Sequence, residues 1–218
     1  MHTQRSSATH NLASQYARSE GSVAFVDESY STPRQRPEGS FYIVTGVVIE
    51  LHRLMEFRNH LQEIADSDFW HTTDLARNQA GRDLIERMTC LVAESATIIH
   101  WIHRPIEASD KEGERARVKT FKQALVDLAS QDLPERGLVV YEKRRDDFQL
   151  RADERVIHEL RSRGQISRDF LIQPASPAIE SALWAADTLA WGFRQLTQGS
   201  SSKYFELQQH VAQIRIVK

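Results

Sequence analysis

The sequence has a single cysteine, Cys90, among its 218 residues. One cysteine cannot form an intrachain disulfide, and it cannot form the cysteine cluster of a structural zinc site. Disulfide-stabilised secreted proteins and cysteine-rich zinc domains are therefore excluded as classes. We expect a cytoplasmic protein, long enough to bury a core without such cross-links.

Long apolar runs and a strong excess of positive charge are also missing. No stretch approaches the roughly 20 apolar residues of a membrane-spanning helix, and the first residues lack the apolar core of a signal peptide. The formal net charge is −2, which excludes a protein that coats nucleic acid through its overall charge. A local basic groove remains compatible with the sequence, and its residues would be Lys143, Arg144 and Arg145.

What is present is a globular composition, with 40% hydrophobic and 27% charged residues. Residues 1–20 are polar and show no periodicity, so we expect a mobile leader there. Residues 21–218 are expected to form one domain, because their length fits a single core and no internal repeat is found.

The hydrophobic pattern predicts alternating strands and helices. Strands are expected at 22–29, 41–50, 97–103, 137–143 and 169–174. Helices are expected at 52–66, 81–95, 118–130, 151–163 and 177–196. No element is predicted for 204–218. Two strands that form an antiparallel pair, followed by helices alternating with strands, predict an α/β or α+β fold with a mixed sheet.

The last predicted helix carries one carboxylate, Asp187, in an otherwise apolar run, SALWAADTLAWGF. The residues three and four positions away are leucine, tryptophan and alanine, so this face of the helix should pack against the core. Burying an unpaired charge costs several kcal/mol. Asp187 therefore needs a basic partner, a hydrogen-bonding loop or a metal ion.

Two further acids follow buried positions at the ends of predicted strands. Asp27 shares a strand face with Val23 and Phe25, and Glu142 follows Leu138 and Val140 in the same way. Together with the helical acid they can converge on one place. Three carboxylates there would repel one another unless a divalent cation, Mg²⁺ or Mn²⁺, held them.

The order of these motifs resembles a bacterial protein family. VAFVDES, the strand FYIVTGVVIE, the segment HTTDL, a late strand ending in an acid and the helix SPAIESALWAADTLAWGF follow one another as in the domain-of-unknown-function family numbered thirty-eight hundred. The resemblance covers most of residues 22–196. It implies a ribonuclease-H-like fold with a five-stranded mixed sheet flanked by helices, and acidic residues that bind metal.

The resemblance also implies which residues form the site. The family's acids fall on Asp27, Glu28, Glu142 and Asp187, and the segment that contains its histidine falls on His71 and Asp74. The sequence departs from the family where Tyr30 replaces a frequent glycine, Trp184 replaces a common glutamine and Glu142 replaces an expected aspartate. These changes would narrow the site or prevent it from holding two ions.

Each candidate has a plainer structural interpretation. Asp27 and Glu142 could cap turns, with Asp146 and Asp147 as substitutes for the latter. Strict alternation points Glu28 away from Asp27, as a turn or surface acid. Asp187 could pair with an arginine near Arg144. Glu180, seven residues earlier on the same helical face, could be a second ligand, and we favour the interpretation as a solvated first-turn acid. His71 could be a loop histidine bonded to a backbone carbonyl.

Other histidines and the tryptophans favour structural roles. His100 and His103 lie at odd spacing on a strand and face opposite sides, so one ion cannot bind both. The four tryptophans could stack on bases, but large aromatic residues at helical spacing are more typical of a core; they are Trp70, Trp101, Trp184 and Trp191.

The acids and the resemblance together predict a metal-dependent phosphodiesterase that acts on nucleic acid. Asp27, Glu142 and Asp187 would hold the cation, which would supply a hydroxide nucleophile and neutralise charge on the phosphate. Glu28 and His71 would complete the catalytic set, and the basic cluster at 143–145 would guide the backbone. The rival is a catalytically inactive module of the same fold that binds nucleic acid or protein, in phage defence or on a mobile element. Its acids would be paired internally.

Overall fold

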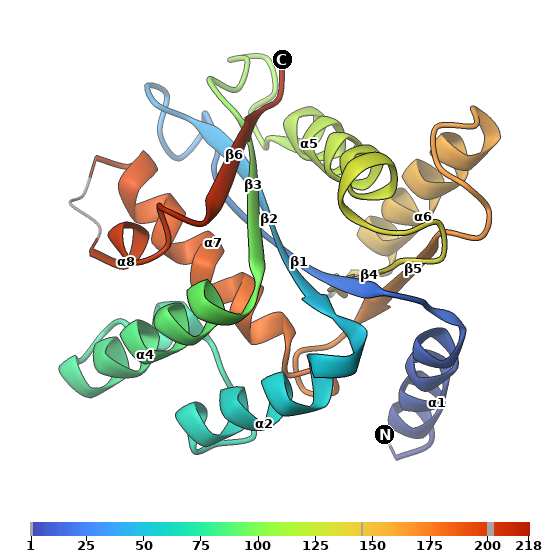
Figure 1. Cartoon of the computed structure of the whole chain (residues 1–218). Coiled ribbons are helices and arrows are strands. Elements are labelled where there is room, and N and C mark those ends of the chain that lie inside the picture. The colour runs from blue at the N-terminus through green and yellow to red at the C-terminus, as the bar shows by residue number, and fades with distance from the viewer. Residues whose placement is uncertain (1, 145, 200–202) are drawn as a thin grey trace.

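A six-stranded sheet forms the centre of the molecule (Figure 1). The structure is a computed structural model, and it describes residues 2–144, 146–199 and 203–218. The strands are β1 (Ser22–Ser31), β2 (Phe41–Glu50), β3 (Thr97–His103), β4 (Leu138–Glu142), β5 (Leu171–Ala175) and β6 (Ala212–Ile216). Their order is β5-β4-β1-β2-β3-β6, with β1–β2 and β2–β3 antiparallel and the other three pairs parallel. The expected mixed sheet is therefore confirmed.

Helices cover both faces of this sheet (Figure 1). They are α1 (His2–Arg18), α2 (Leu54–Ala65), α3 (Thr72–Leu75), α4 (Gln79–Ser95), α5 (Glu114–Asp127), α6 (Asp147–Ser162), α7 (Leu183–Thr197) and α8 (Lys203–Glu206). The core on one face is built from α2, α4 and α7, and the core on the other face from α5 and α6. Within the described ranges, no helix is long and apolar enough to cross a membrane.

Strand β1 is buried on both sides because helices cover both faces of the sheet. Val23 and Phe25 enter the core under α2, α4 and α7, whereas Ala24 and Val26 enter the core under α5 and α6. Alternation along the strand continues past these residues. It sends Asp27 to the α7 side and Glu28 to the α5 side.

Strands β1 and β4 are neighbours, as expected, and their ends are offset. The parallel register pairs Phe25 with Val140 and Val26 with Tyr141, so the next step places Asp27 beside Glu142. β4 ends at Glu142, but β1 continues to Ser31. The last residues of β1 therefore extend beyond β4, next to the chain that leaves β4 at Lys143.

The sheet has six strands, and the expected number of five was wrong. The sixth strand, β6, pairs in parallel with β3 at the edge of the sheet. Its sequence, AQIRI, does not alternate between a buried and an exposed face, and Ile214 and Ile216 are both exposed. An edge strand of this kind lacks the pattern that reveals a strand in a sequence.

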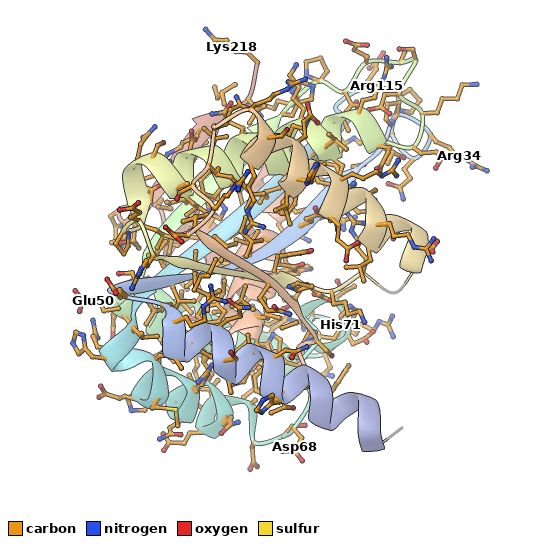
Figure 2. All side chains as sticks on the ribbon, turned by 90° about the vertical axis from the view of Figure 1, so that its right-hand side faces the viewer. Arg34, Glu50, Asp68, His71, Arg115 and Lys218 are labelled. Atoms are coloured by element: carbon orange, nitrogen blue, oxygen red, sulfur yellow. The ribbon has the colours of Figure 1, made fainter. Side chains whose placement is uncertain are left out.

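Residues 2–18 form helix α1, an element that the sequence did not predict. Figure 2 shows this helix in front of the sheet, and it packs beside β5. Leu12 is only 5% exposed and joins the core under α2. The Tyr16 hydroxyl donates a 2.5 Å hydrogen bond to Glu180. A helix held by one leucine and a polar contact shows no apolar periodicity.

That residues 1–20 are a mobile leader stays a prediction, and so does the expectation that residues 21–218 form one domain.

We expected the last helix to begin at Pro177, but α7 begins at Leu183. Residues 176–182 form turns in which the backbone N–H groups of Ile179 and Glu180 both donate to the Ser176 carbonyl. The Glu180 carboxylate is buried, where it accepts bonds from Arg58 and from the Ala182 backbone N–H. The expectation of a solvated Glu180 was therefore wrong, since this acid anchors the turn before α7.

Candidate active site

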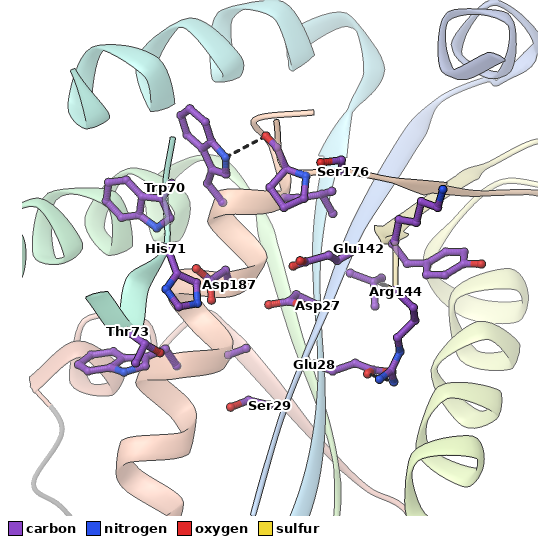
Figure 3. A pocket seen from close by; sticks show the side chains of 18 of the residues that line it. Asp27, Glu28, Ser29, Trp70, His71, Thr73, Glu142, Arg144, Ser176 and Asp187 are labelled. Carbon is purple, nitrogen blue, oxygen red and sulfur yellow. Dashed lines mark hydrogen bonds and ion pairs between the residues drawn. The ribbon is translucent and has the colours of Figure 1, made fainter. Parts of the chain in front are cut away.

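A pocket of about 760 Å³ lies where β1 extends beyond β4. Its wall combines residues of β1, β4, α7 and the segment around α3 (Figure 3). All the described side chains expected at the site line it: Asp27, Glu28, His71, Glu142, Lys143, Arg144 and Asp187. Arg145, the remaining residue of the expected basic cluster, lies outside the described residues.

Asp27 and Glu142 lie side by side on the α7 side of the sheet (Figure 3). The pKa of Asp27 is raised well above its ordinary value, chiefly because burial disfavours the carboxylate and then because Asp187 and Glu142 carry like charge. The backbone N–H of Glu28 counteracts part of this rise. The three acids are therefore close enough to repel one another, as the sequence predicted.

Asp187 is held by the loop that contains α3. Its Oδ2 accepts a 2.9 Å bond from the Thr72 backbone N–H and a 2.8 Å bond from the Thr72 hydroxyl. Burial raises the pKa of Asp187, whereas the two Thr72 bonds and nearby His71 lower it. Of the three partners that the sequence left open, the structure shows the hydrogen-bonding loop.

A second layer of polar groups fixes Thr72. The Trp70 indole N–H lies 3.0 Å from the Thr72 hydroxyl and 3.0 Å from the Thr188 hydroxyl. Thr188 in turn donates to the Trp184 carbonyl one helical turn earlier. This network ties α3 to α7, so the orientation of Asp187 depends on residues that the sequence did not indicate. The sequence feature that could have indicated this network is the segment HTTDL, which contains two threonines and directly follows Trp70.

The face of α7 that carries Asp187 lines the pocket. Leucine, tryptophan and alanine residues three and four positions away share this face, and it also includes Arg194, seven positions away. The opposite face, with Ala185, Ala186 and Leu189, packs into the core below the sheet. As expected, the face that carries Asp187 also packs against the core, since Leu183 and Trp184 are buried core residues. Asp187 itself borders the pocket.

His71 precedes α3 and lies beside Asp187 at the mouth of the pocket (Figure 3). Its Nδ1 is 2.8 Å from Asp74 Oδ2, and about half of each side chain is exposed. Asp74 also pairs with Arg77 at 3.0 Å. A carboxylate partner of this kind orients the imidazole. The histidine is bonded to a side chain and not to the backbone carbonyl considered for it.

Glu28 faces the other side of the sheet, away from the three acids (Figure 3). It forms an ion pair with Arg144 and accepts a 2.6 Å bond from the Tyr42 hydroxyl. Burial nevertheless leaves the pKa of Glu28 raised, because it outweighs the charge of Arg144. Arg144 also lies 3.9 Å from buried Asp153, which pairs with Arg117.

This network changes two expectations for Arg144. Its side chain is only 18% exposed and is held by Glu28, so it does not form an exposed guide for a nucleic-acid backbone. It is also not the partner of Asp187, and among the described residues no arginine forms the ion pair considered for that acid. Lys143, in contrast, is exposed at the edge of the pocket.

His100, His103 and most tryptophans have structural roles, as expected. His100 is buried between Thr45 and Gln208, and His103 bonds the Val217 carbonyl. The buried tryptophans are Trp70, Trp101 and Trp184. Trp191 is partly buried, and it lines the pocket.

Solved structures of ribonucleases H resemble this chain. The ribonuclease H2 from Pyrococcus horikoshii OT3 matches with a TM-score of 0.50 and 14% sequence identity, over 82% of this chain and 74% of that one. The chain has a ribonuclease-H-like fold. Bst-RNase HIII in complex with Mn²⁺ matches with a TM-score of 0.47 and 12% identity, over 91% of this chain and 57% of that one. Protein-family models and curated protein sequences gave no match.

Proposed function

We propose that this protein is a nuclease that cleaves phosphodiester bonds of nucleic acid with a divalent cation, and that it belongs with the family numbered thirty-eight hundred. The observation that supports the proposal is the meeting of Asp27, Glu142 and Asp187 in one pocket of a ribonuclease-H-like fold. The three acids come from β1, β4 and α7. Nothing in the packing of these elements requires three carboxylates to meet, so their repulsion has to be offset in another way.

The donor atoms fit a hard divalent cation. Carboxylate oxygens are the ligands that Mg²⁺ and Mn²⁺ prefer. Burial and then the like charges of Asp187 and Glu142 raise the pKa of Asp27, and a bound cation would offset both effects. Across the described parts of the chain, no three acidic, histidine or cysteine side chains already form a group that could hold an ion. The acids would therefore have to turn toward a common point when a cation binds.

Other residues of the pocket would have separate roles in the reaction. Thr72 occupies Oδ2 of Asp187, so this acid would contact a cation through Oδ1. His71, oriented by Asp74 and exposed beside Asp187, can hold or release a proton at the pocket mouth. Lys143 would contact a backbone phosphate. A bound cation would supply charge neutralisation at the phosphate and an activated water.

The first test measures metal binding and cleavage together. Mg²⁺ or Mn²⁺ should raise the melting temperature of the full-length protein as it saturates the site, because a ligand bound only by the folded state stabilises it. The same ions should support cleavage of RNA–DNA hybrid, double-stranded RNA or single-stranded DNA. Asp27→Asn and Asp187→Asn should each lower the cleavage rate by roughly 100-fold or more and abolish the metal-dependent rise.

Glu56→Gln is the matched control, since Glu56 is an exposed acid on α2 that does not line the pocket. It should leave both measurements unchanged. The proposal fails if the parent protein shows neither a metal-dependent rise in melting temperature nor cleavage of any of the three substrates.

One observation favours a second candidate, a non-catalytic module that binds nucleic acid. Glu28, which the family resemblance assigns to the catalytic acids, is neutralised by Arg144 on the other side of β1. In that case the three pocket acids would not bind a cation. Binding of an oligonucleotide without any response of the melting temperature to Mg²⁺ or Mn²⁺ would identify this second candidate.

A further inference from the structure

Arg194 belongs to the same pocket as the three acids, although the proposed chemistry does not use it. It lies on α7 seven residues after Asp187. Seven residues make almost two turns of an α-helix, so both side chains leave the same face, with their Cα atoms roughly 10 Å apart along the axis. The pocket is thus acidic around Asp187 and basic farther along the same helix.

The direction of α7 shows which end of the pocket contains Arg194. Phe193, the preceding residue, packs with Phe41 and Ile43 of β2. These two residues pair with Ser31 and Ser29 of β1, so α7 and β1 run in the same direction. Ser29 is on the same strand face as Asp27, two residues farther along, and it lines the pocket. Arg194 and Ser29 therefore lie toward the same end.

Arg194 forms no ion pair with any residue that the structure describes, and it is only partly exposed. Its Nε is buried and has no hydrogen-bond partner among the residues that the structure describes. The other arginine that lines the pocket differs, because Arg144 pairs with Glu28. An unpaired buried guanidinium nitrogen costs free energy unless a ligand occupies it.

We propose that Arg194 binds a phosphate of the nucleic-acid strand next to the phosphate held at the acids. This inference rests on the proposed function and adds a second contact to it. The planar guanidinium presents a fork of N–H donors that matches two phosphate oxygens, and the Ser29 hydroxyl can add a donor. Arginine side chains on a helix lean toward its N-terminus, which here is toward Asp187. The strand would thus run along α7, with Lys143 on the other side of the acids.

The test measures binding without cleavage. A fluorescent single-stranded oligonucleotide of about 12 nucleotides is titrated against the full chain carrying Asp187→Asn, in EDTA, over a series of KCl concentrations. Arg194→Met should reduce the slope of log affinity against log salt by about 0.7, the value of one released counterion on a single strand. Arg194→Lys keeps the charge and should keep the slope. Arg87→Met, at an exposed position of α4 outside the pocket, should match the parent.

Each outcome decides the inference. An unchanged slope for Arg194→Met, or no binding of the oligonucleotide by the parent, would overturn it. A lower melting temperature with an unchanged slope would assign Arg194 a structural role only, whereas a reduced slope with an unchanged or higher melting temperature supports a phosphate contact. Failure of the proposed function would look different: the slope would still change, but the chain with native Asp187 would not cleave in Mg²⁺ or Mn²⁺.

Discussion

At the scale of single residues, Asp187 shows how an apolar helix can carry a carboxylate. Two bonds from Thr72 satisfy one of its oxygens, and the carboxylate borders a pocket while Leu183 and Trp184 on the same face are buried in the core. Asp187→Asn should therefore leave the metal-free stability the same or slightly higher, because an amide oxygen can accept the same bonds while the repulsion of Asp27 is relieved. Urea unfolding in EDTA measures this change.

An ion-paired Asp187 would respond in the opposite way. Removing one partner of a buried ion pair costs about 3–5 kcal/mol, and a loss of that size in metal-free Asp187→Asn would show that a charged partner compensates the parent residue. Asp74→Asn offers a comparison, since Asp74 is a half-exposed acid of the same loop whose pairs with His71 and Arg77 lie near the surface. Its effect should stay below about 1 kcal/mol.

At the scale of elements, helix α1 depends on one buried acid of the turn before α7. Tyr16 donates to Glu180, and Arg58 both pairs with this acid and lies over the Tyr16 ring. Tyr16→Phe keeps the ring and removes the hydroxyl, so it should cost about 1.5–3 kcal/mol, the range for a hydrogen bond to a charged group. Chemical denaturation measures the loss. Exposed His10 on the same helix provides the control His10→Ala, which should be nearly neutral.

An effect of Tyr16→Phe no larger than that of His10→Ala would mean that α1 contributes little to stability. In that case residues 1–20 would add little to the free energy of unfolding, as expected of a leader, even though residues 2–18 are helical.

The elements also show what the sequence could and could not predict. β2 and β3 were predicted at their observed bounds, because long β-branched runs bounded by turn residues mark buried strands. β6 and α1 lie at the periphery, where few apolar contacts leave a pattern. The start of α7 was missed because Glu180 bonds across the fold to Arg58, a contact that no local pattern contains.

The residues of the candidate site also divide into those that the sequence predicted and those that it did not. Alternation along β1 correctly separated Asp27 from Glu28, and the strand ends correctly brought Asp27 and Glu142 together. Thr72 and Arg194 were missed because their importance comes from the packing of α3 and α7 against the acids. Only the fold supplies that information.

At the scale of the whole molecule, two buried groups should give stability opposite dependences on pH. Burial lowers the pKa of His100 to about 4, so the unfolded chain binds its proton more readily, and stability should fall by about 3 kcal/mol as the pH drops from about 6.5 to about 4. The raised pKa of Asp27 acts in the other direction. There the folded chain holds the proton, and stability should rise as the pH drops through that pKa toward the unfolded value of about 3.9.

Two variants separate these contributions. His100→Asn should remove most of the loss between about pH 6.5 and about pH 4, and Asp27→Asn should make the remaining loss steeper. Urea unfolding at about pH 7 and about pH 4.5 measures both. The ring of His100 is enclosed by Thr45, Gln208, Phe193 and Phe205. If the free energy of unfolding depends on pH in the same way in the parent and in His100→Asn, His100 is not the acid-sensitive group.

The order of the strands has a consequence for how the protein is made. β1 and β2 can pair as soon as they leave the ribosome, but β1 must wait for β4, more than a hundred residues later, before its other edge is covered. Such distant pairings fold slowly. Asp27 emerges early and meets Asp187 only after α7 has been synthesised, so the complete set of acids forms near the end of translation. A chain released prematurely would carry part of the site and none of its combined chemistry.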